Sequence, residues 1–254
     1  MTPQLLFYDF GPRVVAFSTT RHGGVSQGNY GSLNINSYCG DDMEAVAENR
    51  RLLSLELPIP NASRIIVPHQ VHDSVVQVID EDTLGQQELI EGVDALITRL
   101  PGVCIGVSTA DCIPIIIYDP VHHCAAAVHA GWRGTVKQIA ESVARQMYAF
   151  YRSDYGEMQV MIGPGISLKN FEVGQEVYDE FLQAGFPMER IVAKHAKWHI
   201  DLPLCNRLQL EQLGIRPENI RETGICTYDH ADDFFSARRL GINSGRIFTG
   251  VILR

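Results

Sequence analysis

Short runs of valine, isoleucine and other apolar residues recur along the chain, each bounded by glycine, proline or aspartate. Runs of four to seven residues with such boundaries are typical of β-strands. They predict strands over residues 14–19, 64–67, 75–79, 95–98, 103–108, 113–118, 124–129, 158–162, 224–227 and 246–252.

Other segments space their apolar residues three or four positions apart, which places them on one face of a helix. Asp41 and Asp42 can cap such a helix, which then runs to about Leu55. A second helix is predicted to open at Gly134 and Thr135 and to run past Met147. Two more are predicted over 174–184 and 203–213.

The segment PVHH, residues 120–123, separates two predicted strands. It is too short for a crossover between parallel strands and predicts an antiparallel hairpin. A doubly wound Rossmann sheet is therefore disfavoured. The mixture of strands and helices predicts an α+β fold, and no linker divides residues 1–254, so we expect a single domain.

Composition narrows the function classes. The 254 residues include 21 basic and 30 acidic side chains, a net charge of −9, so no positive field recruits nucleic acid. No run of 18 uncharged apolar residues or signal-peptide pattern occurs, which argues against a membrane segment. Six cysteines without a C-x-x-C pair predict reduced thiols and a cytoplasmic protein. Oligomeric state is left open.

The densest chemical signal lies in VCIGVSTADCIPIIIYDPVHHCAAAVHAGWRGT, where Cys112 and His129 can face each other. His72, in QVHD, stands near the start of another predicted strand. Two imidazoles and a thiolate bind a borderline-soft divalent cation such as Zn²⁺ and leave a position open for water or substrate. The alternative is metal-free, with Cys112 as nucleophile, His129 as base and Asp111 or Asp94 as its orienting partner.

Four arginines are candidate substrate ligands because guanidinium groups clamp phosphates and carboxylates. Arg133 lies in AGWRGT, a strand-to-helix turn whose free N–H groups can attract an anion or can simply form a tight turn with Trp132 packed beneath it. Arg21 lies in STTRHGGVSQGNYGSLN, and Arg238 and Arg239 lie in CTYDHADDFFSARR.

Several other motifs are weaker. His69 is expected near the site rim or at the surface, and His122 and His123 in an exposed hairpin loop. GVSQG around Ser26 has the G-x-S-x-G sequence of the nucleophile elbow of serine hydrolases. That motif needs a helix directly after it, whereas a turn-forming segment follows here, so a serine hydrolase is disfavoured.

Taken together, QVH, PGVCIGVSTADCIPI, AAAVHAGWRGT, IGPGIS and FFSARR occur in the order found in the YfiH-like laccase-domain family, which the chain resembles from about Ser18 to Arg246. Members of that family carry the names polyphenol oxidase, purine nucleoside phosphorylase and peptidoglycan editing factor. The resemblance implies a four-layer α/β/β/α sandwich with mixed sheets. It also implies a zinc site at His72, Cys112 and His129.

The resemblance further implies phosphorolysis of adenosine, inosine or methylthioadenosine to base and ribose 1-phosphate, with adenosine deamination as a second activity. Its alternatives are a zinc amide hydrolase that edits peptidoglycan precursors, and a binding protein without turnover. A further alternative is copper-dependent oxidation of polyphenols, because imidazole and thiolate ligands bind Cu²⁺ more tightly than they bind Zn²⁺. Multicopper oxidases use many histidines in His-x-His pairs, and this chain has nine histidines and no such pair.

Overall fold

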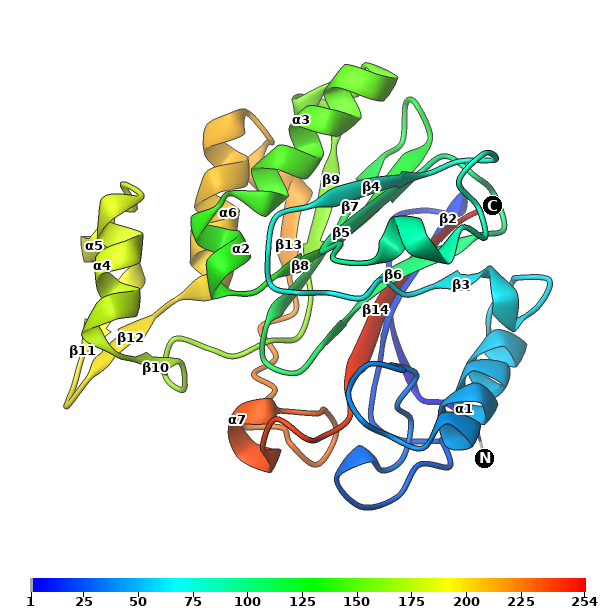
Figure 1. The fold of residues 1–254 in the computed structure, drawn as a ribbon. Helices are drawn as coiled ribbons and strands as arrows, with labels where there is room; N and C mark the ends of the chain where they lie inside the picture. Colours follow the sequence, from blue (N-terminus) through cyan, green and yellow to red (C-terminus); the bar gives the residue numbers. More distant parts are fainter. Residues whose placement is uncertain (1) are drawn as a thin grey trace.

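A computed structural model describes residues 2–254 (Figure 1). Its strands form two large sheets and one small one. The first sheet has five strands in the order β1 (Leu5–Tyr8), β2 (Val14–Thr19), β14 (Ile247–Leu253), β6 (Cys104–Thr109) and β3 (Ile65–Ile66).

The second sheet has six strands, and both large sheets mix parallel with antiparallel pairs. Its order is β13 (Ile220–Glu222), β9 (Gln159–Ile162), β7 (Ile113–Asp119), β8 (Cys124–Ala130), β5 (Ala95–Thr98) and β4 (Val76–Ile79). The small sheet joins β10 (Glu172–Val173), β12 (Trp198–Ile200) and β11 (Val192–Lys194).

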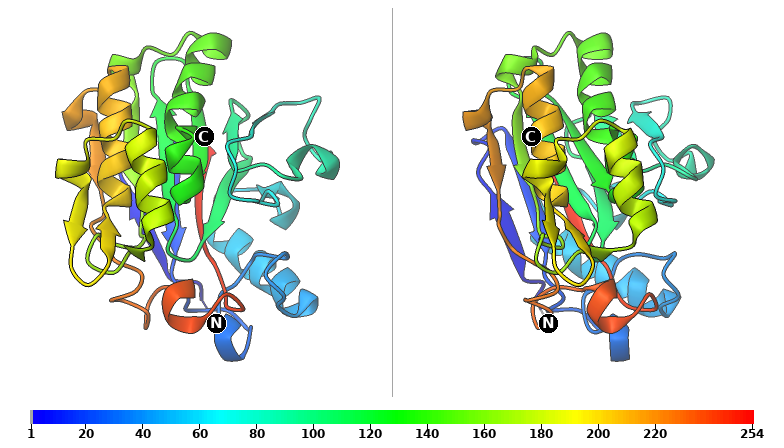
Figure 2. Two further views of the ribbon diagram at one scale, coloured as in Figure 1. Left: turned by 60° about the vertical axis from the view of Figure 1, so that its left-hand side comes forward. Right: turned by 90° about the vertical axis from the view of Figure 1, so that its left-hand side faces the viewer.

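The long helices lie on the outer faces of the large sheets, whereas α4 packs against the small sheet (Figures 1 and 2). Helices α3 and α6 cover the six-stranded sheet, and α1 covers the other side of the molecule. Their bounds are α1 (Met43–Glu56), α2 (Trp132–Val136), α3 (Ile139–Tyr151), α4 (Gln175–Gln183), α5 (Met188–Ile191), α6 (Leu202–Leu213) and α7 (Ala237–Leu240).

The alternation of side chains along each strand builds the layers, because successive residues point to opposite faces of a sheet. In β7, Ile115 and Ile117 pack toward α3, whereas Ile116 and Tyr118 pack between the two sheets. Both faces of the strand are buried, which explains its continuous apolar run. The fold is therefore a mixed α+β sandwich with mixed sheets, as expected.

Most of the predicted elements are present, including the antiparallel hairpin of β7 and β8 and the Asp42 cap of α1. Two predictions were wrong. The helix expected to open at Gly134 is interrupted, since Gln138 takes a left-handed backbone with φ +61° between α2 and α3. The strand expected over 224–227 is a loop that makes one bridge to Gly165, and the strand lies earlier, at β13.

No helix within residues 2–254 combines the length and apolar character needed to cross a bilayer.

Candidate metal centre

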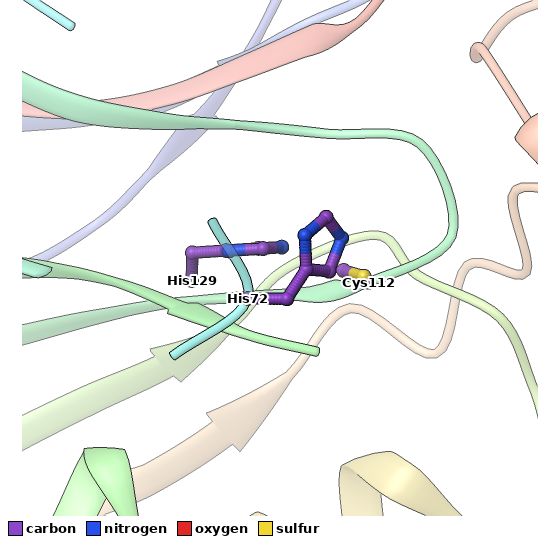
Figure 3. Close-up of side chains that lie close together, drawn as sticks. All are labelled: His72, Cys112 and His129. Atoms are coloured by element: carbon purple, nitrogen blue, oxygen red, sulfur yellow. The ribbon is translucent and has the colours of Figure 1, made fainter. Parts of the chain in front are cut away.

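His72, Cys112 and His129 converge at one end of the sandwich (Figure 3). His129 lies near the end of β8, Cys112 directly precedes β7, and His72 lies in the loop before β4. One nitrogen of each histidine and the Cys112 sulfur all lie within 4.8 Å of one another. Within residues 2–254, no other group of three or more His, Cys, Asp or Glu side chains has this geometry.

Asp94 orients two of the three residues. Its Oδ1 is 2.6 Å from Nδ1 of His129 and accepts the backbone N–H of His72 at 3.0 Å, while Oδ2 accepts the N–H of Asp73 at 2.9 Å. These bonds leave Nε2 of His129 facing the cluster and hold His72 in a left-handed backbone with φ +62°. A carboxylate behind a histidine is the usual arrangement around protein-bound zinc.

Gln70 attaches the same loop to strand β6. Its side-chain amide donates to the carbonyl of Ser108 at 2.9 Å, and its carbonyl accepts the N–H of Ser108 at 2.7 Å. The loop that carries His72 is thus fixed from two sides. A metal ligand held in this way loses little conformational entropy on binding.

Asp111 shapes the turn that presents Cys112. It has φ +88°, and its carboxylate accepts the Thr227 hydroxyl and the backbone N–H of Arg238, each at 2.7 Å. Its partners lie in the CTYD and SARR motifs, so these motifs anchor the turn. Of the two aspartates considered as the orienting partner of His129, Asp94 fills that position and Asp111 does not.

Gly131 leaves room for the cluster. A Cβ added there would lie 3.0 Å from the sulfur of Cys112 and 3.2 Å from Cδ2 of His72. In AGWRGT the chain passes from β8 through Gly131 into helix α2, and Arg133 stacks over Trp132 with its guanidinium carbon 4.3 Å from the ring centroid. Packing between the turn and the cluster therefore accounts for this glycine.

The electrostatics of the cluster favour a thiolate. Burial by itself raises the pKa of the Cys112 thiol, but the imidazoles of His129 and His72 outweigh burial and lower this pKa. Burial lowers the pKa of His129, but the Cys112 thiolate and Asp94 outweigh burial and raise it. The thiolate is the form that binds metals and the form that acts as a nucleophile.

The donor set fits a single divalent metal ion. Two imidazole nitrogens and one thiolate match the preferences of zinc, and three protein ligands leave a fourth position free. Gly131 provides the space beside the sulfur. The side chain of His72 is exposed, that of Cys112 is half-buried and that of His129 is buried, so the cluster opens on one side.

That open side faces a cavity of about 520 Å³, which is large enough for a nucleoside-sized ligand. Tyr38 and His69 stack on its wall with ring centroids 4.2 Å apart, and His69 is 2.7 Å from Glu91. Ser108 and Thr109 also line the cavity, but their hydroxyl oxygens are fully buried and have no hydrogen-bond partner within residues 2–254. His69 thus lies at the rim, whereas His122 and His123 bond within the β7–β8 hairpin and to the chain end.

None of the four candidate arginines lines this cavity. Arg21 donates to the carbonyls of Gly31 and Ala231, and Arg238 to that of Glu172. Arg133 and Arg239 are exposed and stack on neighbouring aromatic rings. Arg246 lines the cavity instead. Sequence reasoning missed it, because the GINSG segment before it has no pattern that signals a ligand.

Comparisons with known proteins agree with this fold. A model of the family described as "Multi-copper polyphenol oxidoreductase laccase" matches residues 15–254. The purine nucleoside phosphorylase of Bacteroides thetaiotaomicron is 44% identical over 93% of this chain and 90% of its own length. Adenosine deaminase RL5, from an unknown prokaryotic organism, is 42% identical over 94% of this chain and 93% of its own length.

Solved structures extend the likeness to three dimensions. YfiH of Bacillus licheniformis superposes with a TM-score of 0.92 at 25% identity, covering 100% of this chain and 97% of that one. YlmD of Geobacillus stearothermophilus has a TM-score of 0.89 at 31% identity, covering 95% and 92%.

Proposed function

The chain belongs to the multi-copper polyphenol oxidoreductase laccase family, and we propose that within this family it is a zinc-dependent purine nucleoside enzyme. The proposed reaction is phosphorolysis of adenosine, inosine and methylthioadenosine to the free base and ribose 1-phosphate, with deamination of adenosine as a second activity. The names of two relatives that are more than 40% identical support both activities. The observation that carries the proposal is the His72, Cys112 and His129 cluster, open to a cavity of about 520 Å³.

His72, Cys112 and His129 are the proposed metal ligands and catalytic residues. When bound, a zinc ion supplies Lewis-acid polarisation of a substrate oxygen or nitrogen and lowers the pKa of coordinated water. Asp94 holds Nδ1 of the His129 ring, which leaves Nε2 facing the cluster, where it would bind the ion. Gln70 and Asp94 together keep the His72 loop in place while substrate enters.

The cavity wall offers the contacts that a purine nucleoside needs. The stacked rings of Tyr38 and His69 provide a flat aromatic surface beside which a base packs. The hydroxyls of Ser108 and Thr109 are fully buried and lack protein partners within residues 2–254, and we propose that on binding they rotate toward polar atoms of the substrate. A buried hydroxyl without a partner costs free energy unless a ligand satisfies it.

A function as a phenol oxidase with several copper ions has less support. The one cluster of metal-binding geometry within residues 2–254 has three donors, which suits one ion. Copper in this site would be a mononuclear centre, since coupled copper chemistry needs further histidines nearby. An amide hydrolase acting on peptidoglycan precursors and a binding protein without turnover use the same cavity, and product analysis separates them.

The test is incubation of the zinc-loaded protein with adenosine, inosine or methylthioadenosine, with and without phosphate. We expect base and ribose 1-phosphate only with phosphate, and inosine from adenosine without it. Cys112→Ser should lose both reactions, while Cys205→Ala, on the buried face of α6, should keep them. Absence of all these products from the wild type contradicts the proposal, and release of an amino acid from a UDP-muramyl substrate supports the hydrolase.

A further inference from the structure

The cavity that contains the cluster differs from the acidic molecule around it, because its lining holds a basic side chain and no carboxylate. The protein carries a net charge of −9, yet no aspartate or glutamate lines the cavity. Its charged or titratable lining consists of Arg246, Tyr38, the thiol groups of Cys39 and Cys112, and three histidines, His69, His72 and His129. Arg246 is the one side chain in this lining with a permanent positive charge, because guanidinium groups stay protonated in proteins. It therefore offers the cavity a contact for an anion or for a ligand with an anionic group.

Arg246 is held in place by neutral groups. Its Nη1 donates to the carbonyls of Ser244 and Gly245 at 2.5 and 3.0 Å, and its Nη2 donates to the carbonyl of Ile242 at 2.9 Å. Its backbone N–H donates to Oδ1 of Asn34 at 3.1 Å. Within residues 2–254 no carboxylate lies within ion-pair distance of the guanidinium, and Nε has no acceptor. The group is thus fixed in position, with its charge unpaired.

An oxyanion is the ligand that suits such a group. The N–H donors of a guanidinium match the spacing of oxygens on phosphate, and the charge strengthens each hydrogen bond. Hydrogen bonds to the loop carbonyls use some of the guanidinium N–H groups of Arg246 and fix the direction of the others. This reduces the entropy lost when a ligand binds. Among the arginines of the chain, Arg246 is the one that shares its cavity with the His72, Cys112 and His129 cluster.

We propose that Arg246 binds the inorganic phosphate consumed in phosphorolysis, an inference that rests on the proposed function. One phosphate oxygen forms a bond to C1′ of the ribose as the bond from C1′ to the base nitrogen breaks. The electron pair of that bond goes to the base, and the proton of hydrogenphosphate ends on a base nitrogen. Arg246 holds the phosphate, while the cluster and the aromatic wall hold the nucleoside.

Kinetics of the zinc-loaded protein test this assignment. For Arg246→Gln we expect the KM for phosphate to rise about 10- to 100-fold, as expected for loss of one or two hydrogen bonds to a charged group. The ratio of phosphorolysis to adenosine deamination should fall by a similar factor, since deamination consumes water rather than phosphate. Arg145→Gln, an exposed surface arginine paired with Glu141, is the matched control and should leave the ratio unchanged.

Thermal unfolding with added phosphate, at constant ionic strength and without nucleoside, gives a direct binding readout. The Tm of the wild type should rise with phosphate, and that of Arg246→Gln should rise less. If the glutamine variant fails to fold, Arg246→Lys, which keeps the charge but loses the planar donor set, should still show a raised phosphate KM.

Two outcomes separate this inference from the proposed function. If the wild type phosphorolyses nucleosides and the Arg246 variants have an unchanged phosphate KM and an unchanged phosphate-dependent Tm, the assignment of Arg246 is overturned while the function stands. If no nucleoside turns over but phosphate stabilises the wild type more than Arg246→Gln, the anion site is supported and the proposed reaction is not.

Discussion

At the scale of single residues, a methyl group added at Gly131 would press directly on the cluster. Its backbone, with φ −66° and ψ 169°, is accessible to alanine, so Gly131→Ala should fold. The new Cβ would lie 3.0 Å from the Cys112 sulfur and 3.2 Å from His72. We expect zinc affinity to fall about 10- to 100-fold, because overpacking by one methyl typically costs 1–3 kcal/mol.

Competition with a chromogenic chelator measures the zinc affinity. Unfolding of the metal-free protein measures its stability without zinc. A drop in the stability of the metal-free protein as large as the loss in binding energy would show that Gly131 serves the turn rather than the metal site.

Asp94 makes a separate prediction, because it acts through His129 and through the backbone of the His72 loop. Asp94→Asn places an amide N–H where one oxygen now accepts backbone N–H groups, so part of this network must break. Loss of such a supporting carboxylate typically lowers metal affinity 10- to 100-fold. Competition with the same chelator measures the zinc affinity of Asp94→Asn. Asp73→Asn, one residue from His72 but exposed and bonded to Lys137, is the control and should keep its affinity.

At the scale of elements, the β7–β8 hairpin depends on Asp119. Its buried carboxylate accepts the N–H groups of Val121 and His122 at 2.8 and 3.1 Å and lies 2.8 Å from Nδ1 of His122. Burial by itself raises the pKa of Asp119, but hydrogen bonds from Ser153 and His122 outweigh burial and lower it below the usual value. This carboxylate therefore stabilises the fold above its unfolded-state pKa, and that stability is lost as pH falls through the folded-state pKa.

We expect Asp119→Asn to reduce the free energy of unfolding by about 2 kcal/mol at pH 7, and the difference from wild type to shrink toward pH 3. Urea unfolding at a series of pH values measures it, with exposed Asp232→Asn as control. Stability curves that stay parallel from pH 7 to pH 3 would exclude this role.

The glycine-rich segment 23–34 depends on Asn49 of α1. The buried Asn49 amide donates to the Ser26 hydroxyl and to the carbonyls of Ser32 and Asn34, and its oxygen accepts the N–H of Val25. Asn49→Ala leaves these groups unpaired and should lower the free energy of unfolding by about 3 kcal/mol. Asn219→Ala, which removes a single bond to Gly156, should cost about 1 kcal/mol in the same urea titration. Equal losses of unfolding free energy in Asn49→Ala and Asn219→Ala would contradict this role of Asn49.

The elements differ in how far sequence pattern predicts them. Strands β5 and β7 were predicted because burial on both faces leaves a continuous apolar run. The interruption between α2 and α3 was not predicted, because glycine is the residue that usually signals a left-handed backbone and this position holds Gln138. The two-residue strand β10 is too short to show alternation, and its pairing with β12 depends on tertiary contacts.

At the scale of the whole molecule, the cluster could be predicted from residue chemistry and from a family resemblance, but not from spacing. His72, Cys112 and His129 belong to three segments that only the closed sandwich brings together. Asp94 could be assigned as the orienting partner only once β5 and β8 were seen to pair. Arg246 reaches the cavity because β14 lies between β2 and β6, a strand order that no local pattern encodes.

This convergence predicts that metal binding and folding are coupled, since a ligand that binds only the folded chain stabilises it. At zinc concentrations of 100 times Kd the gain is about 2.7 kcal/mol. Removal of zinc with a chelator should therefore lower the Tm of the wild type and leave that of Cys112→Ser unchanged. Hydrogen exchange should then rise together in residues 69–73, 110–113 and 129–134, because one ion joins all three segments. A rise confined to one segment, or an equal chelator effect in both proteins, would place the metal elsewhere.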